Sequence, residues 1–301
     1  MPLPTAAALT ERLPRPLRRH RLMTAWMRMT GEDPLQLVRI RDDAFGYADM
    51  RDGFLRLIVI DGDYDRDFFR IADALLAGGG TFLDVGANFG LLSFGLARRH
   101  ADRVSFHLFE PIPRLVAAIE RTRALYPAMR AEVNAMAAAD FDGEAGFEVA
   151  EDQTGRSHLD PGGSLRTRCI RLDTYMAERG VERVDLLKLD VEGYELSALH
   201  GAEAALARGT IGAIYFEYFE KYLVRVGEPA ALIRFLGGRG YEVCFCRAYD
   251  LAGAGGATHT LAPDRAGHGL PLRPIGGCRL PPMTDLFAAP REALVPLEAT
   301  A

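Results

Sequence analysis

The chain has 301 residues, of which 49% are hydrophobic and 26% are charged, and its formal net charge is -5. This composition is typical of a globular protein, and a membrane span is excluded because no apolar stretch approaches the roughly 18 residues that one needs. The negative charge argues against nucleic acid as a partner, since its recognition normally needs a basic face. The opening MPLPTAAALTERLPRPLRRH lacks the order of a secretion signal, so we expect a cytoplasmic protein.

Residues 1–35 form a locally basic arm. Over residues 11–30, six arginines oppose Glu11 alone, while Leu22, Trp26 and Met29 recur at helical spacing. The pattern predicts a helix with a solvated basic face and one apolar stripe packed on its own domain. Peripheral contact with an anionic membrane surface or partner is the alternative interpretation.

After this arm, residues 36–78 alternate around Gly46 and Gly53 and then turn helical, which predicts a small antiparallel strand region with a lead-in helix. In residues 79–250, short apolar runs alternate with helical segments, as in a parallel sheet covered on both faces. The expected strands are 81–85, 104–110, 131–138, 184–190, 211–219 and 241–249, and the expected helices are 91–100, 115–126, 193–208 and 229–237.

Residues 251–301 are rich in Gly and Pro and predict a loop segment with one late strand, MTDLFAAP at 283–290. The cysteines show no metal-ligand spacing and no disulfide framework. Cys244 and Cys246 are expected on one face of a strand in the core.

The string LDVGANFG indicates a cofactor-binding turn. Asp84 ends a strand, and Gly86 and Gly90 bracket the turn into a helix whose first N–H groups lack partners. Glu110 ends the next strand 26 residues later, so the two acids suit the two hydroxyls of a ribose. The spacing differs from G-x-G-x-x-G, and an acid at the turn would repel a pyrophosphate. S-adenosylmethionine, which carries cationic sulfonium and amino groups, is therefore favoured over NAD.

Three strings together resemble the FkbM family of S-adenosylmethionine-dependent methyltransferases: DVGANFG, FEP and LDTYMAERGVERVDLLKLDVEGYELSALHGA. The resemblance covers residues 55–220. It is carried by the turn that contains Asn88 and by Leu172, Asp173, Lys188, Asp190, Glu192, Gly193 and Glu195.

This resemblance implies an α/β, Rossmann-like class I methyltransferase fold. A mostly parallel seven-stranded sheet would have helices on both faces, with N-terminal and C-terminal extensions. The implied reaction is O-methylation of a sugar, a glycolipid or a polyketide-type natural product. The likeness to class I methyltransferases also implies that Asp140, after the third strand, accepts a hydrogen bond from the adenine amino group.

The charges of VDLLKLDVEGYEL follow the fourth strand and face the same crevice as Asp84 and Glu110. Methyl transfer is an in-line displacement during which an acceptor hydroxyl loses its proton. We predict Asp190 as the base or as the residue that orients the acceptor hydroxyl, with Lys188 and Glu192 as further catalytic residues. Glu195 belongs to the first turn of the next helix, where it offsets the helix dipole.

Lys188 is one of two lysines among 36 basic residues and has two interpretations. Burial would lower its pKa and make it useful in catalysis, or it forms a structural ion pair with Asp190 or Glu217.

A divalent cation held by Asp190 and Glu192 with Asp173 or Glu217 is a further alternative, but no third ligand is evident and we predict no metal.

The expected partner is a small-molecule or carbohydrate acceptor, and the oligomeric state is open. Two competing functions remain. One is an NAD-dependent oxidoreductase, and the other is a non-catalytic module that binds S-adenosylmethionine.

Overall fold

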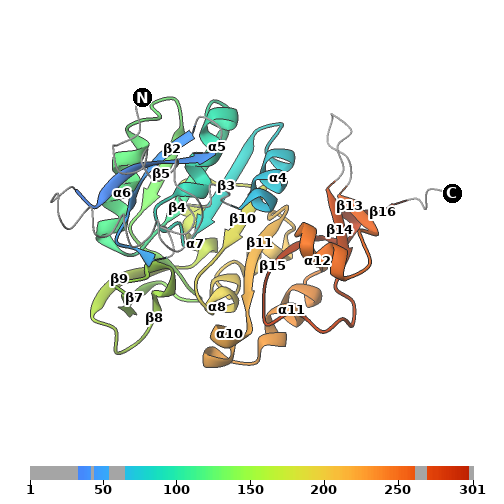
Figure 1. The fold of residues 1–301 in the computed structure, drawn as a ribbon. Helices are drawn as coiled ribbons and strands as arrows, with labels where there is room; N and C mark the ends of the chain where they lie inside the picture. The colour runs from blue at the N-terminus through green and yellow to red at the C-terminus, as the bar shows by residue number, and fades with distance from the viewer. Residues whose placement is uncertain (1–32, 42–43, 54–64, 262–269, 298–301) are drawn as a thin grey trace, which may run out of the picture.

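The structure is a computed structural model that describes residues 33–41, 44–53, 65–261 and 270–297. The predicted basic arm therefore lies almost wholly outside the described residues. A ten-stranded sheet forms the centre of the described part (Figure 1). From one edge to the other its strands are β16 (Leu294–Pro296), β13 (His259–Leu261), β14 (Pro271–Pro274), β12 (Tyr241–Phe245), β15 (Met283–Pro290), β11 (Ile214–Phe219), β10 (Leu186–Leu189), β3 (Gly80–Val85), β4 (Val104–Phe109) and β5 (Arg130–Asn134).

Seven of these strands form the predicted mostly parallel sheet, in the order β5-β4-β3-β10-β11-β15-β12. All neighbours from β5 to β11 pair in parallel, whereas β15 is antiparallel to both β11 and β12. The chain moves outward from β3 to β5 and then returns to place β10 on the other side of β3. Ligands of open α/β sheets bind where the strand order reverses, so this topology directs attention to the carboxyl ends of β3 and β10.

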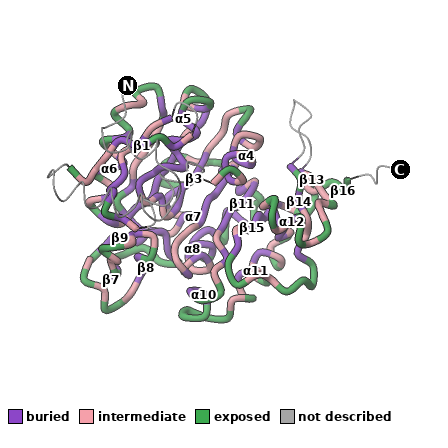
Figure 2. The backbone as a smooth tube through the Cα atoms, viewed as in Figure 1, coloured by how far each residue is buried: buried purple, intermediate pink, exposed green. Residues whose placement is uncertain are grey.

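Helices cover both faces of the sheet because successive strand residues point to opposite sides. Phe82 joins the core under one face, and Leu83 joins the core under the other. The central strands are accordingly buried (Figure 2). The first face is covered by α4 (Arg66–Leu75), α5 (Leu91–His100) and α6 (Pro113–Arg123). The second is covered by α7 (Leu172–Arg179), α8 (Glu195–His200), α9 (Glu203–Ala207), α10 (Glu220–Val226), α11 (Pro229–Gly238) and α12 (Ala248–Gly253).

An N-terminal hairpin of β1 (Leu35–Arg41) and β2 (Ala44–Asp49) packs against α5 and α6. The Tyr47 backbone N–H donates to the Thr122 hydroxyl at 2.9 Å, and the Phe45 N–H donates to the Tyr126 hydroxyl at 2.7 Å. The predicted antiparallel strands are confirmed for β1 and β2, and the predicted stretch after Gly53 lies outside the described residues. These contacts make the hairpin part of the core rather than a separate unit.

A second, four-stranded sheet was not expected from the sequence. It consists of β6 (Ala137–Ala138), β9 (Leu165–Ile170), β7 (Gly143–Glu148) and β8 (His158–Leu159). The prediction of one strand over 131–138 is wrong in extent, because the chain leaves the main sheet after Asn134. The loop between β7 and β8 carries the short helix η1 (Thr154–Arg156).

The loop segment predicted for the Gly/Pro-rich residues 251–301 is wrong for the described part of that range. Its residues form α12, β13, β14, β15, the short helix η2 (Arg291–Ala293) and β16, which extend the sheet at one end of the molecule (Figure 1). The late strand MTDLFAAP is confirmed as β15. The single helix expected over 193–208 is split into α8 and α9. Cys244 and Cys246 are buried in the core as predicted.

Candidate active site

The carboxyl ends of four neighbouring strands bring most of the predicted site residues together. Asp84 pairs in register with Lys188 across β3 and β10, and Asp190 follows β10 directly. Glu110 follows β4, and Glu217 lies in β11 beside β10. The topology thus places four carboxylates and one lysine around one crevice, although they are far apart in the sequence.

Lys188 is buried, and its ammonium group has three oxygen neighbours. Its Nζ lies 3.4 Å from Asp84 Oδ1 and 3.3 Å from Asp190 Oδ2, and it donates a hydrogen bond to the Gly86 carbonyl at 2.7 Å. Burial opposes the charge, but the carboxylates of Asp190 and Asp84 outweigh it and raise the pKa of Lys188 above its ordinary value. The interpretation that burial lowers this pKa is wrong. Lys188 is a fixed cation in an ion pair, and Asp84 is a partner that the sequence did not suggest.

Asp84 faces the protein interior. Its Oδ2 accepts a hydrogen bond of 2.6 Å from the Ser93 hydroxyl, and its side chain is 1% exposed. Asp84 lines neither of the two cavities that open at this crevice. The geometry therefore gives Asp84 a supporting position under the turn rather than an open face toward a ribose.

Position 86 requires a glycine because the turn after β3 passes close to the end of β10. Gly86 has a φ of +77°, and a Cβ there would overlap the Asp190 carbonyl oxygen. The backbone N–H of Asp190 donates to the Val85 carbonyl at 3.1 Å, so β10 and the turn are in direct contact at this point. Gly90, with a φ of +69°, precedes the first residue of α5. The turn residues thus bring the end of β10 against the cofactor-binding turn predicted from the sequence.

Two adjoining cavities open at this crevice. The inner cavity has a volume of about 70 Å³ and its walls include Glu110, Met136, Ala137 and Leu159. The outer cavity has a volume of about 220 Å³ and its walls include Lys188, Glu217, Phe219, Tyr222 and Met283. The residues common to both linings are Gly86, Asn88, Gly155, Asp190 and Glu192.

Glu110 lies buried in the wall of the inner cavity. Its Oε2 accepts from the Asn88 backbone N–H at 2.9 Å, and its Oε1 accepts from the Ile112 N–H at 2.9 Å. Burial raises the pKa of Glu110 to about 8, although both backbone hydrogen bonds act in the opposite direction. Each carboxyl oxygen has a second lone pair, so Glu110 is able to accept from further hydroxyl groups.

Three carboxyl groups meet where the cavities join. Oxygen atoms of Asp190, Glu192 and Glu217 lie within 4.8 Å of one another. Burial, and then the charges of Asp190 and Glu217, raise the pKa of Glu192 to about 10. Burial and the charge of Asp190 raise the pKa of Glu217 to about 9. Both shifts favour the protonated form of these glutamates, and the Asp190 side chain beside them is 44% exposed.

Asp173 lies outside this group of carboxyl groups. Its carboxylate accepts from the Ala204 and Ala205 backbone N–H groups at 2.8 Å each, so of the two further cation ligands considered, only Glu217 joins Asp190 and Glu192. Glu195 begins α8 as expected and accepts from the Val191 N–H at 3.1 Å, outside both cavity linings.

The structure does not bring Asp140 to the inner cavity. It lies beyond β6 and accepts from the Ser197 hydroxyl at 3.1 Å, beside a different cavity of about 680 Å³. The apolar residues Met136 and Ala137 occupy the expected position after the third strand instead. Several lining residues carried no motif in the sequence, among them Thr154, Arg156, Tyr194, Phe219 and Tyr222.

A family model described as the methyltransferase FkbM domain matches residues 84–243, more than half of the chain. The chain belongs to the FkbM methyltransferase family. The range matched to this family contains every residue of the inner cavity and every residue of the outer cavity except Met283. The resemblance read from the sequence is therefore confirmed.

Two curated relatives are similar to this FkbM-family chain. AMB antimetabolite synthetase AmbE of Pseudomonas aeruginosa is 31% identical over an alignment of 228 residues, and the match covers 62% of this chain and 10% of that protein. The 31-O-demethyl-FK506 methyltransferase FkbM of Streptomyces tacrolimicus is 29% identical over an alignment of 174 residues, and the match covers 47% of this chain and 66% of that protein. The chain thus spans a tenth of the first relative and just under two thirds of the second.

Solved structures of methyltransferases resemble the FkbM-family chain at lower identity. A methyltransferase FkbM from Methylobacillus flagellatus is 17% identical, with a TM-score of 0.40, over 55% of this chain and 39% of that one. A SAM-dependent O-methyltransferase from Thermotoga maritima is 14% identical, also with a TM-score of 0.40, over 87% and 80%. Within the described ranges, no helix has the length and apolar character needed to cross a bilayer.

Proposed function

We propose that this protein transfers a methyl group from S-adenosylmethionine to a hydroxyl group of a sugar, a glycolipid or a polyketide-type natural product. The observation that carries the proposal is that carboxyl groups, and no basic side chain, line the inner cavity. Its lining includes Glu110, Asp190 and Glu192, and no Lys or Arg among the described residues. Such a cavity favours a cationic ligand and would repel a pyrophosphate, which argues against the NAD-dependent alternative.

The residues of the inner cavity fit this cofactor. Glu110 is the acceptor for the ribose hydroxyls, because it is buried at a strand end and has free lone pairs. Met136, Ala137 and Leu159 offer apolar surface to the adenine ring. Gly86 and Asn88 then extend toward the junction with the outer cavity, where the methionine portion and its positive charges would meet Asp190.

The outer cavity is the proposed acceptor site. Phe219, Tyr222 and Met283 supply its apolar surface, and Asp190 lies at its junction with the inner cavity. When bound, S-adenosylmethionine supplies an electrophilic methyl group. Asp190 would accept the proton of the acceptor hydroxyl during methyl transfer, and the Lys188 ammonium group 3.3 Å away would orient Asp190.

Glu192 and Glu217 have a different role in this proposal from that of Asp190. Since both are protonated at neutral pH, they donate hydrogen bonds to acceptor oxygens rather than remove protons. We retain the sequence prediction that Glu192 acts at the site, with this change in its role.

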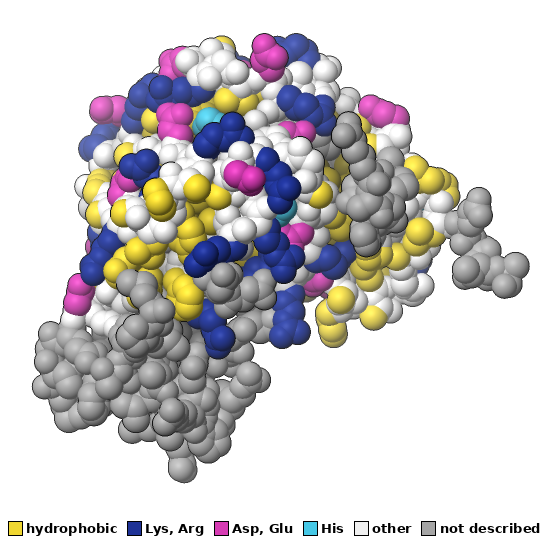
Figure 3. All heavy atoms as spheres, turned by 90° about the horizontal axis from the view of Figure 1, so that it is seen from above, with side chains coloured by type: hydrophobic (Ala, Val, Ile, Leu, Met, Phe, Trp, Pro, Cys, Tyr) yellow, Lys and Arg dark blue, Asp and Glu magenta, His cyan; other side chains and the backbone are white. Residues whose placement is uncertain are grey.

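A hydroxyl acceptor is supported by the name of the Streptomyces relative, a 31-O-demethyl-FK506 methyltransferase, which describes an O-methylation. A nucleic-acid acceptor is disfavoured because, on the face shown in Figure 3, basic side chains are interspersed with acidic ones rather than gathered.

Calorimetric titration with S-adenosylmethionine tests the cofactor assignment. We expect the wild type to bind and Glu110→Ala to weaken binding about tenfold or more. Asp140→Asn is the matched control, because Asp140 lies at another cavity and its replacement should leave affinity unchanged. A wild type that does not bind S-adenosylmethionine, or that binds NADH instead, would refute the assignment.

Turnover with a panel of sugars and polyketide-type alcohols tests the catalytic assignment and excludes a non-catalytic module. We expect Asp190→Asn to retain S-adenosylmethionine binding, with a lower affinity because the charge that meets the cofactor is gone, and to lose about 100-fold or more in kcat, the usual effect of removing a general base. Full activity of Asp190→Asn would remove it from this role.

A further inference from the structure

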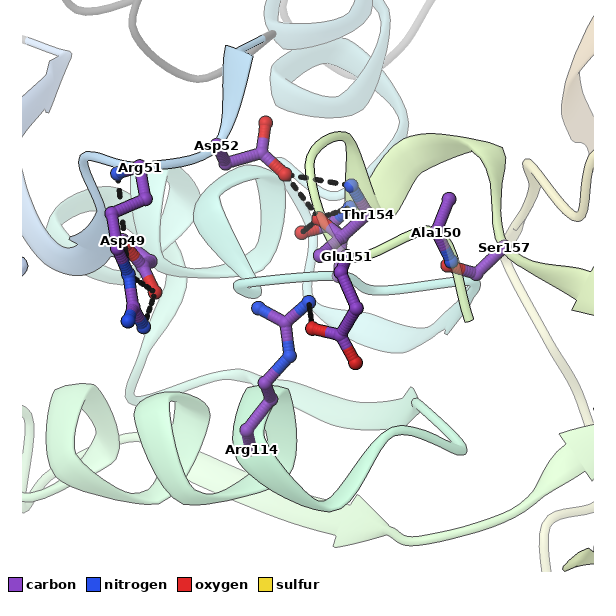
Figure 4. Close-up of polar contacts among 9 residues, drawn as sticks. Asp49, Arg51, Asp52, Arg114, Ala150, Glu151, Thr154 and Ser157 are labelled. Atoms are coloured by element: carbon purple, nitrogen blue, oxygen red, sulfur yellow. Dashed lines mark hydrogen bonds and ion pairs between the residues drawn. The ribbon is translucent and has the colours of Figure 1, made fainter. Parts of the chain in front are cut away.

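The segment that follows β2 is joined to the site by a buried carboxylate (Figure 4). Asp52 points toward Thr154, and its Oδ2 accepts from both the backbone N–H and the hydroxyl of Thr154 at 2.7 Å each. Both residues are buried. Hydrogen bonds to a charged acceptor are among the stronger ones in proteins, and here one oxygen holds two groups of the same residue.

Thr154 transmits this contact to the turn after β3. Its hydroxyl oxygen accepts from the Asn88 side-chain amide at 3.2 Å while its hydrogen is donated to Asp52. Asn88 has a φ of +53°, and its own backbone N–H donates to Glu110. A continuous chain of hydrogen bonds therefore runs from Asp52 through Thr154 and Asn88 to the carboxyl group proposed to bind the ribose.

The loop that Asp52 holds is a common wall of both cavities. Thr154, Gly155 and Ser157 line the inner cavity, whereas Gln153, Gly155 and Arg156 line the outer one. Movement of this loop would open the inner cavity to water and displace the wall next to Asn88.

Further contacts hold the same loop in place. The Gly53 N–H donates to the Asp152 carbonyl at 3.1 Å, and Arg114 of α6 forms an ion pair of 3.0 Å with Glu151 (Figure 4). Glu151 is largely exposed, so water weakens that ion pair. Asp52 is the buried anchor of the loop.

We propose that Asp52 is a positioning residue for cofactor binding: it fixes the wall at Thr154 and, through Thr154, the conformation of Asn88 beside Glu110. Asp52 lies outside residues 84–243, so the N-terminal segment completes a site that the family domain does not complete alone. This inference rests on the proposed function, because the affected ligand is S-adenosylmethionine.

The experiment compares cofactor affinity with stability in the full chain. Asp52→Ala removes the anchor, Thr154→Val keeps the shape of Thr154 but removes its hydroxyl, and Thr154→Ser keeps the hydroxyl. We expect the first two to raise the Kd for S-adenosylmethionine about tenfold, and Thr154→Ser to stay within about twofold of the wild type. The KM for the cofactor should rise similarly, with kcat changing little.

Asp185→Ala is the control for loss of stability alone. Asp185 accepts a backbone N–H from Thr81 at 2.8 Å, as Asp52 does from Thr154, but Asp185 precedes β10, at the end of that strand away from the site. We expect it to lower the thermal midpoint without changing the Kd. If Asp185→Ala weakens binding as much as Asp52→Ala, affinity follows stability and the inference is refuted.

The outcomes separate this inference from the proposed function. If the wild type, Asp52→Ala and Thr154→Val bind S-adenosylmethionine equally, the inference fails while the proposed function stands. If the wild type does not bind it, both fail. If Asp52→Ala does not fold, the affinities of Thr154→Val and Thr154→Ser for S-adenosylmethionine are compared instead. Equal affinities would mean that the Thr154 hydroxyl does not act in binding, and the inference would be refuted.

Discussion

Replacement of Lys188 by methionine tests the buried ion pair beneath the site. Methionine keeps an unbranched side chain of similar length, so the change mainly removes the ammonium group. Asp84 is almost fully buried, and its Oδ1 has no hydrogen-bond partner among the described residues. Lys188 Nζ at 3.4 Å is the cation that offsets its charge. We expect Lys188→Met to leave an uncompensated carboxylate in the interior.

The magnitude follows from the three contacts of Nζ. Removing one partner of a buried ion pair costs about 3–5 kcal/mol, which applies to Asp84. The contact with Asp190 contributes about 0–1 kcal/mol, since that side chain is 44% exposed and water screens it. Loss of the hydrogen bond to the Gly86 carbonyl adds about 1 kcal/mol. The free energy of unfolding should therefore fall by about 5 kcal/mol, and the thermal midpoint by about 8 °C, because the entropy of unfolding of a chain of this length is about 0.6 kcal/mol/K.

Urea denaturation at neutral pH is the assay. The folded-state pKa of Lys188 is raised, so its contribution is complete below the ordinary lysine pKa of about 10.4 and is lost only as pH rises through the folded value. Lys221→Met, at the only other lysine, is the control and should change stability by less than about 0.5 kcal/mol.

The double variant Lys188→Met/Asp84→Asn completes the test. It should recover more than half of the loss, because the uncompensated charge is gone. A loss below about 2 kcal/mol in Lys188→Met, or a double variant no more stable than the single one, would refute the reasoning.

Two other properties of the site can be measured by the same denaturation. Glu217 has a folded pKa of about 9 and an unfolded value near 4.3, so stability falls as pH rises between them. Glu217→Gln should flatten that fall by up to about 1.4 kcal/mol per pH unit, and parallel pH profiles would contradict this. Gly86→Ala should lower the free energy of unfolding by about 3 kcal/mol or more, because the added Cβ would overlap the Asp190 carbonyl oxygen. Gly180→Ala is the control and should cost about 1 kcal/mol, because a Cβ there would meet nothing within 4 Å. Equal costs would count against a steric requirement at Gly86.

The central sheet could be predicted because its strands are buried on both faces and therefore appear as apolar runs. β10, whose four residues are all buried, is the clearest case. The place of β15 could not be predicted in the same way. MTDLFAAP has the composition of a strand, but its position between β11 and β12 depends on pairing with residues distant in sequence.

The four-stranded second sheet gave no such signal. β7, with the sequence GEAGFE, is largely exposed, and β9 alternates exposed and buried residues, so neither forms an apolar run. From the sequence alone, the third strand is therefore predicted to continue to residue 138, and Asp140 is predicted to follow its end directly. The turn of the chain into β6 places Asp140 beside Ser197 instead.

For the site, the sequence identified residue types but not their ionisation. Lys188, Asp190 and Glu192 could be located because they lie in or just after the end of an apolar strand. The pKa of Lys188 is raised by Asp190, two residues away, and also by Asp84, which precedes it by more than 100 residues and was not evident as a partner. The contact between Asp52 and Thr154 is equally non-local, and neither residue belongs to a motif.

The carboxyl groups that line the inner cavity bear on the choice between S-adenosylmethionine and NAD, which the spacing of the glycines leaves open. Burial raises the pKa of both Glu110 and Glu192 above neutrality, so each of these carboxyl groups would ionise only at a cost in free energy. A cationic ligand reduces that cost, whereas a pyrophosphate increases it. The argument for S-adenosylmethionine over NAD therefore rests on the whole lining of the cavity, in which Gly86 and Gly90 serve mainly to bring the strand ends and α5 close together.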